Sequence, residues 1–347
     1  MYLGFYNFYR QYNGNRMFTD PASPIGDNLM YPFVHLGQKL RSLGHQAATL
    51  DMDDVSKFDA AVFLDHPTLL NPYFRQLQKM RDKKLYLFLL ENPANRPDNY
   101  WAFNHRAFEK VFTWNPQLVD GKKYHRFYLP NRIPPSIKIE PEEKRKFCVT
   151  IASQKYSSHP QELYSERIRA IRWFEELHPE EFDLFGTLWE HPYFTGRLAR
   201  LNLGLHPVYV RFPDTLRKKR FPSHRGTVPS KHDVLRQYKF AICYENAVFP
   251  GYVSEKIFDA LFAGCIPVYL GAPDVTDMLP PEIFIDKRRF KTYDELYDYL
   301  RNMPEAEYLK YRQAIEQFLT GPGIRPFSAE HFADTILQHI VNGNVTP

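Results

Sequence analysis

The sequence is poor in cysteine, with only Cys148, Cys243 and Cys265 among 347 residues. Each cysteine lies in an apolar run, and their spacing does not match that of a metal site, so we expect buried free thiols. Free thiols favour a reducing compartment. The thirteen histidines form no H-E-x-x-H pattern, and the sequence therefore gives no support for zinc chemistry.

The sequence also lacks a long hydrophobic run and a large excess of one charge. No stretch approaches the ~20 apolar residues of a membrane span, and the N-terminal residues MYLGFYNFYRQYNGNR do not resemble a signal peptide. The net charge of +5 suits an anionic ligand or a membrane surface but falls short of the basic stripe of a nucleic-acid binder. We therefore expect a cytoplasmic protein, at most peripheral to a membrane, with no nucleic-acid partner.

Apolar runs and helical periods alternate along the chain in two series. The segment 129–146, rich in proline and charge, separates them as a linker. The alternation predicts an α/β fold of two doubly wound, Rossmann-like domains facing across a cleft, with ligands at the carboxyl ends of the strands. Strands are expected at 1–8, 59–65, 84–91, 110–114, 147–153, 182–186, 238–246 and 265–271, and helices at 29–43, 162–177, 254–263, 292–302, 304–319 and 328–342.

The domain boundaries follow from this alternation. We expect an N-terminal α/β domain over 1–145 and a C-terminal α/β domain over 146–325. A helix within 326–347 is expected to pack back on the N-terminal domain. Two domains agree with the length of the chain, at about 150 residues for each domain.

The stretch 244–271 contains the first candidate site. It ends a strand, turns at Pro250 and Gly251, and opens a helix with Glu255 and Lys256. A lysine at the positive end of a helix dipole is unfavourable by roughly 0.3–1 kcal/mol unless an anion lies there. The N–H groups of the first turn and Lys256 would hold a phosphate, and Glu255 would accept hydrogen bonds from a ribose diol. The alternative is a structural helix with an ordinary N-terminal glutamate.

A second candidate is Glu91, which ends the apolar strand 84–91 and precedes Asn92 and Pro93. A carboxylate that emerges from a sheet into a cleft is well placed to act as a general base. The alternative is a polar strand terminus before a proline turn.

The helix 162–177 carries two arginines, Arg167 and Arg169, in its first half. Arginine binds phosphate oxygens bidentately, so either residue is a candidate for an anion site. The alternative is a solvated basic face.

Two further charged motifs are weaker candidates. Asp51 and Asp53 form an acid–x–acid pattern of the kind that holds Mg²⁺ or Mn²⁺, but aspartate also favours turns in its own right. The basic run TLRKKRFPSHR, 215–225, would suit an acidic acceptor or membrane lipid, yet a solvated loop is the simpler interpretation.

The segment YKFAICYENAVFPGYVSEKIFDALFAGCIPVYLGAPDV, 238–275, resembles the signature of the α-1,3-fucosyltransferases, glycosyltransferase family 10. Weaker similarities are found in FEKVFTWNPQLVDGKKY, 108–124, and RGTVPSKHDVLRQYKF, 225–240. The resemblance covers roughly 84–320, and residues 1–83 match only in outline. It implies the GT-B fold, with an acceptor-binding N-terminal domain and a GDP-sugar-binding C-terminal domain.

The resemblance also implies roles for single residues. Asn246, Tyr252, Glu255 and Lys256 fall on donor-site positions, with Glu255 on the ribose and Lys256 on the diphosphate. Arg167 fits best as the second phosphate cation, with Arg169 as the alternative, and Glu91 falls on the general base. No metal ligand is expected, although a divalent metal could stimulate the enzyme without being bound.

The implied activity is an inverting transfer of L-fucose from GDP-fucose to a hydroxyl of a GlcNAc-containing oligosaccharide, in α-1,3 or α-1,4 linkage or both. A bacterial-type member would serve lipopolysaccharide or surface-glycan synthesis, in the cytoplasm or at the cytoplasmic face of the inner membrane. Two alternatives stay open. One is a GT-B transferase that uses another GDP-sugar, and the other is a noncatalytic protein that binds a nucleotide sugar or a glycan.

Overall fold

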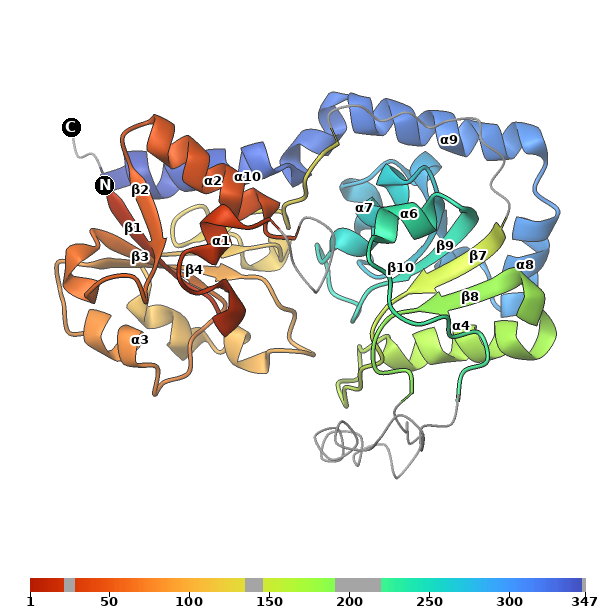
Figure 1. Cartoon of the computed structure of the whole chain (residues 1–347), viewed down its shortest axis with the longest axis horizontal. Coiled ribbons are helices and arrows are strands. Elements are labelled where there is room, and N and C mark those ends of the chain that lie inside the picture. The colour runs from red at the N-terminus through yellow and green to blue at the C-terminus, as the bar shows by residue number, and fades with distance from the viewer. Residues whose placement is uncertain (22–28, 135–145, 191–219, 345–347) are drawn as a thin grey trace. The chain divides into compact units, whose positions relative to one another are not determined.

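The computed structural model describes residues 1–21, 29–134, 146–190 and 220–344, and the chain divides into two compact units (Figure 1). Unit 1 comprises Met1–Pro135, Pro250–Glu255 and Gly321–Pro347, and unit 2 comprises Ser136–Phe249 and Lys256–Thr320. These divisions fall ten residues before the expected boundary at 145 and five residues before the expected boundary at 325. The sequence also gave no indication that the loop Pro250–Glu255 groups with the N-terminal unit.

Unit 1 is built on a six-stranded sheet in the order β2-β1-β3-β4-β5-β6. All of its neighbouring strands are parallel, which requires a crossover between successive strands. The central strands are apolar throughout because both faces of the sheet are covered. The strands are β1 Tyr2–Tyr6, β2 Gln46–Thr49, β3 Ala60–Leu64, β4 Lys84–Leu89, β5 Lys110–Thr113 and β6 Tyr124–Arg126.

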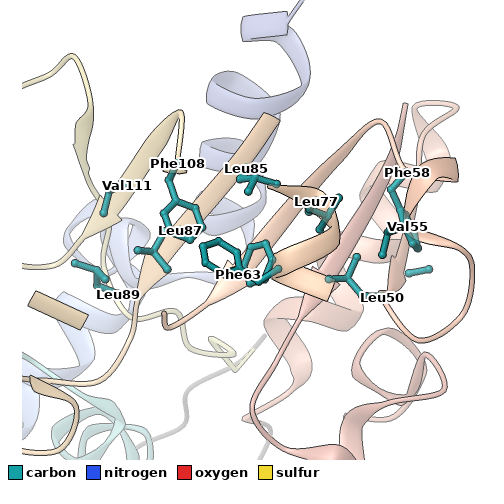
Figure 2. Packing of buried hydrophobic residues seen from close by; sticks show 13 residues of the cluster. Leu50, Val55, Phe58, Phe63, Leu77, Leu85, Leu87, Leu89, Phe108 and Val111 are labelled. Carbon is teal, nitrogen blue, oxygen red and sulfur yellow. The ribbon is translucent and has the colours of Figure 1, made fainter. Parts of the chain in front are cut away.

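One face of this sheet carries the cluster drawn in Figure 2. Leu85, Leu87 and Leu89 alternate along β4 toward this face, where they meet Phe63 of β3 and Leu77 of α3. The helical segments of unit 1 before the linker are α1 Arg16–Thr19, α2 Tyr31–Ser42 and α3 Pro72–Leu77, with short 3₁₀ turns η1 Arg10–Tyr12, η2 Val55–Lys57, η3 Pro97–Tyr100, η4 Ala102–Ala107 and η5 Pro116–Leu118.

The opposite face of the sheet is covered by the end of the chain. Helix α10, Ala329–Ile336, lies beside α2, where Phe332 packs edge-on against Phe33 and also contacts Phe88 of β4 (Figure 1). An ion pair between Lys39 and Asp334 joins the same two helices. The C-terminal segment thus contributes directly to the core of unit 1. It begins with η12 Pro322–Phe327 and continues past α10 as a π-helical turn, Leu337–Val341, and η14 Asn342–Asn344.

Unit 2 is built on a five-stranded parallel sheet in the order β11-β10-β9-β7-β8. Its strands are β7 Lys146–Ile151, β8 Phe182–Phe185, β9 Tyr238–Tyr244, β10 Ile266–Leu270 and β11 Ile285–Asp286. Its helices are α4 Tyr164–Leu177, α6 Lys231–Leu235, α7 Glu255–Phe262, α8 Tyr293–Arg301 and α9 Glu305–Thr320, with η6 Pro179–Glu181, η9 Val275–Asp277, η10 Pro281–Ile283 and η11 Lys287–Arg289.

The predicted α/β fold with two parallel sheets is confirmed, and each predicted strand and helix has a counterpart in the structure. The strands β2, β6 and β11 are not among the expected ones, because they are only four, three and two residues long and show no clear period. The short helices α1, α3 and α6 were missed for the same reason. Within the ranges that the structure describes, no helix has the length and hydrophobicity required to span a bilayer.

Candidate functional site

In unit 1, Glu91 lies where β4 ends, as predicted. Its side chain is half-buried, and its Oε2 accepts a hydrogen bond from Asn95 Nδ2 at 2.7 Å. The Tyr100 hydroxyl donates to the Glu91 main-chain oxygen at 2.9 Å and fixes the turn that follows. Glu91 therefore has a defined backbone position and a carboxylate that is not withdrawn into the core.

A second carboxylate, Asp65, follows the neighbouring strand β3 and was not predicted as a site residue. Asp65 is only 6% exposed and has a φ of +63°, which is uncommon for a residue with a side chain. Its Oδ1 accepts hydrogen bonds from the Leu90 and Glu91 N–H groups, at 2.7 and 3.1 Å. Burial raises the pKa of Asp65 to about 6, and the negative charge of Glu91 is the second cause. The signal in the sequence was a carboxylate placed directly after an apolar strand, as at Glu91.

Further polar groups surround this carboxylate pair. Arg96 pairs with Asp98 at 2.7 Å, donates to the His66 main-chain oxygen at 2.7 Å, and places its guanidinium 4.0 Å from the centre of the Phe8 ring. Burial raises the pKa of the Tyr9 hydroxyl, with the charges of Glu91 and then Asp65 as further causes. The loops after β1, β3 and β4 thus converge on the two carboxylates.

In unit 2, Lys256 faces an anion that belongs to the protein itself. Its Nζ lies 3.5 Å from Oε2 of Glu245, which is completely buried directly after β9. Gly271 makes room for this carboxylate, because a Cβ there would lie 2.5 Å from the Glu245 Cγ. Glu245 was not predicted, although it stands in the Glu-Asn pair that ends the strand. A buried carboxylate therefore accounts for part of the stabilisation of a lysine in the first turn of α7.

The loop Pro250–Glu255 belongs to unit 1, where it packs against Trp114. Gly251 has a φ of +77°, and a Cβ there would lie 2.3 Å from the Trp114 main-chain oxygen, so this position requires glycine. Tyr252 is buried, with its ring centre 4.9 Å from that of Trp114. Glu255 is half-buried at the start of α7.

The remaining predicted donor residues lie in unit 2 around the end of β9. Asn246 is half-buried, and its main-chain oxygen accepts from the Leu163 N–H at 3.0 Å. Arg167 is 3% exposed and donates through Nη2 to the main-chain oxygens of Tyr244 and Glu245, at 2.8 and 3.2 Å. The Arg167 guanidinium therefore supports the backbone that carries Glu245. The side chain of Arg169 is 68% exposed and pairs with Glu166.

Because their environments differ, the two arginines are expected to contribute differently to the free energy of unfolding. Arg167→Ala is expected to lower the free energy of unfolding by roughly 2 kcal/mol, because it leaves buried carbonyl oxygens without their charged donor. Arg169→Ala is expected to change it by less than about 0.5 kcal/mol, because its ion pair is exposed. Urea denaturation of both variants measures the difference. Equal losses of stability would contradict the supporting role of Arg167.

The weaker candidates have local partners. Asp53 pairs with Lys57 at 2.6 Å and accepts from the Tyr2 hydroxyl at 3.1 Å, while Asp51 accepts from the Gly14 N–H at 2.8 Å. No cluster of three or more His, Cys, Asp or Glu side chains suited to a metal occurs in the described part of the chain.

The basic run 215–225 is described only in part. Residues 215–219 lie outside the described residues, and residues 220–225 lie within them. The three cysteines are buried and free, as predicted.

Comparisons with known proteins bear on these residues. Residues 217–320 match a family described as "Glycosyltransferase family 10 (fucosyltransferase) C-term". An alpha-(1,3)-fucosyltransferase, FucT, of Helicobacter pylori is 45% identical over 74 residues, which are 21% of this chain and 16% of that protein. A GDP-fucose protein O-fucosyltransferase 3 of Xenopus tropicalis is 41% identical over 108 residues, 31% of this chain and 22% of that protein. The matches thus span about a fifth of the length of these curated relatives.

Solved structures extend the likeness to the whole fold. A crystal structure of an alpha1,3-fucosyltransferase with GDP-fucose superposes with a TM-score of 0.57 at 17% identity, and covers 100% of this chain and 91% of that one. At this identity the likeness concerns the fold alone. It agrees with the GT-B architecture that the sequence predicts.

Proposed function

We propose that the chain belongs to glycosyltransferase family 10 and that it is an inverting fucosyltransferase. It transfers L-fucose from GDP-fucose to a hydroxyl of a GlcNAc-containing glycan, in α-1,3 or α-1,4 linkage or both. The observation that carries the proposal is the family match over 217–320, which includes four of the predicted donor residues: Asn246, Tyr252, Glu255 and Lys256. The crystallised relative of like fold was studied with this same donor.

The proposed donor site uses both charges at the start of α7. Lys256 binds the diphosphate of GDP together with N–H groups of the first helical turn. A diphosphate there would share the lysine with Glu245, the buried carboxylate 3.5 Å from Nζ. Glu255 accepts hydrogen bonds from the ribose, and Asn246 and Tyr252 line the donor site.

Arg167 requires a dual role in this proposal. Its Nη2 is engaged by two main-chain oxygens, and a guanidinium carries five N–H donors in all. In this role the Arg167 guanidinium, bound at the end of β9, would also attract the negative charge of the diphosphate. Arg169, exposed on the same helix, is the alternative phosphate ligand.

The proposed reaction is a direct displacement at the anomeric carbon of fucose. Glu91 takes the proton of the acceptor hydroxyl as its oxygen bonds to that carbon, while the bond from the carbon to the β-phosphate oxygen breaks and the configuration inverts. The transition state is oxocarbenium-like, as in glycoside hydrolysis. Negative charge then builds on the β-phosphate, where Lys256, Arg167 and the helix N-terminus stabilise it. These cations supply the charge compensation, so the proposed mechanism assigns no step to a metal.

The acceptor and the biological setting are the finer parts of the proposal. We propose a glycan acceptor because an α-1,3 linkage, as in the name of the H. pylori relative, is a bond to a sugar hydroxyl. A surface glycan such as lipopolysaccharide, built in the cytoplasm or at the inner face of the membrane, is the proposed product.

The test is a donor and acceptor array with the purified protein. GDP-fucose and an N-acetyllactosamine-type acceptor are expected to yield GDP and a fucosylated product, whose linkage is then determined by NMR. Turnover with a different GDP-sugar and none with GDP-fucose would contradict the proposed donor and favour a GT-B transferase that uses another GDP-sugar. GDP binding without turnover of any donor would favour a noncatalytic nucleotide-sugar-binding protein.

A further inference from the structure

We infer that Asp65 is a positioning residue that acts through Glu91 in the transfer reaction. It holds the backbone at Glu91 and keeps a negative charge beside the Glu91 carboxylate. The inference rests on the proposed function, since it assigns Glu91 as the base. Asp65 itself forms and breaks no bond, because the proton of the acceptor hydroxyl passes to Glu91.

The backbone contacts are the first support. Asp65 and Glu91 are separated by 26 positions in the sequence, yet β3 and β4 pair in parallel with Leu64 opposite Phe88. Both strands therefore deliver a carboxylate to the same edge of the sheet. The Asp65 N–H donates to the Phe88 main-chain oxygen at 2.8 Å, and its Oδ1 accepts from the N–H groups of the next turn. Glu91 cannot shift without breaking these contacts.

Asn99, in the turn η3 of the loop after β4, also binds this oxygen. It is fully buried, donates through Nδ2 to Asp65 Oδ1 at 2.6 Å, and accepts from the His66 N–H at 2.7 Å. The His105 ring nitrogen Nε2 lies 2.6 Å from the Asn99 main-chain oxygen. The loops after β3 and β4 are thus fastened to each other through the carboxylate of Asp65.

The charge of Asp65 is the second support. All three hydrogen bonds reach Oδ1, and Oδ2 has no hydrogen-bond partner among the residues that the structure describes. A carboxylate that served only to cap the turn would need just one acceptor oxygen, as an asparagine provides. Asp65 is instead buried as an acid whose pKa, at about 6, is well above the ordinary value for aspartate.

This raised pKa has a cost in stability that a purely structural residue need not carry. A folded-state pKa above the unfolded value means that the acid stabilises the fold fully below the unfolded pKa of 3.8, and that this stabilisation is lost as the pH rises through about 6. At pH 8 the ionised Asp65 therefore opposes folding. A charge retained at such a position is typical of a functional site.

Other titratable groups facing the pair do not ionise near pH 6. The pKa values of Tyr9 and Tyr100 are raised by burial, that of Asp98 is lowered by its hydrogen bond from Arg96, and that of His66 is lowered to about 4 by burial. Arg96 stays cationic in this range. Among these groups Asp65 is thus the one that changes charge as the pH passes through 6, and the repulsion between its anion and the Glu91 carboxylate is relieved when Glu91 takes the proton.

The experiment compares pH profiles of kcat/KM from pH 5 to 9 for the wild type and Asp65→Asn. The wild type is expected to lose activity with an inflection near pH 6. Asparagine keeps the acceptor oxygen but carries no charge, so Asp65→Asn is expected to lack the inflection at pH 6. Its kcat/KM is expected to be about 3–10-fold lower at pH 8, because repulsion by a neighbouring anion no longer favours proton transfer to Glu91. Its midpoint of thermal unfolding at pH 8 is expected to equal or exceed that of the wild type. An inflection retained in Asp65→Asn, or a profile unchanged from the wild type, would overturn the inference.

Two further variants complete the design. Asp120→Asn is the matched control, because Asp120 Oδ1 also accepts three N–H groups in unit 1, from Lys122, Lys123 and Tyr124, and it should keep the wild-type profile. Asn99→Ser removes a hydrogen bond that lowers the pKa of Asp65, so its inflection should move above pH 6. An inflection that stays in place in Asn99→Ser contradicts the assignment even if Asp65→Asn does not fold. Failure of the proposed function is distinguishable, since the wild type would then show no fucosyl transfer at any pH.

Discussion

Glu91→Gln is expected to reduce fucosyl transfer by about 10²–10⁴-fold, the usual contribution of a general base. Glutamine is nearly isosteric, and its amide oxygen can accept the hydrogen bond that Asn95 donates to Glu91. The backbone contacts of Glu91 to Asp65 and Tyr100 do not involve the carboxylate and remain. The variant should therefore fold, and it should bind GDP with an affinity within about twofold of the wild type.

The measurement is a single-turnover assay with saturating GDP-fucose, combined with calorimetric titration of GDP. Glu109→Gln is the control, because Glu109 is an exposed glutamate of the same unit, close to the start of β5. Full activity in Glu91→Gln would remove Glu91 from the role of base. A parallel loss of GDP affinity would indicate instead that the substitution disturbs the fold.

Lys256→Ala is expected to weaken GDP binding by about 10–100-fold, the range expected when a charged hydrogen-bond partner is removed. The substitution also leaves Glu245 without the ammonium group 3.5 Å away, and Glu245 is completely buried. Loss of that pairing is expected to lower the free energy of unfolding by about 1–3 kcal/mol. Affinity and stability should thus fall together.

A control and a double variant separate these two effects. Lys231→Ala removes a comparable ion pair, since Lys231 Nζ lies 2.7 Å from Asp259 Oδ2 of α7 and both side chains are 16% exposed. It should lose stability but keep GDP affinity. Glu245→Gln/Lys256→Met removes both charges and should regain stability without regaining affinity. Unchanged GDP affinity in both Lys256 variants would refute the phosphate assignment.

The sequence by itself determined the local elements and the chemistry they present. Alternating apolar runs and helical periods gave both sheets, because the period of the side chains is set by backbone geometry within each element. The turn at Pro250 and Gly251 was also readable, since proline and glycine together favour a break between a strand and a helix. The carboxylate after β4 and the Glu-Lys pair at α7 were visible for the same reason, as each lies next to a recognisable boundary.

The tertiary structure decided which of these groups meet. Asp65 approaches Glu91 because β3 pairs with β4, and strand pairing depends on contacts across the sheet that no single stretch of sequence encodes. The pairing of Lys256 with Glu245, and the use of Arg167 to bind the backbone at the end of β9, likewise join residues from different elements. A lysine at the start of a helix indicates that an anion lies nearby. Only the folded chain shows that a buried carboxylate of the protein itself already provides one.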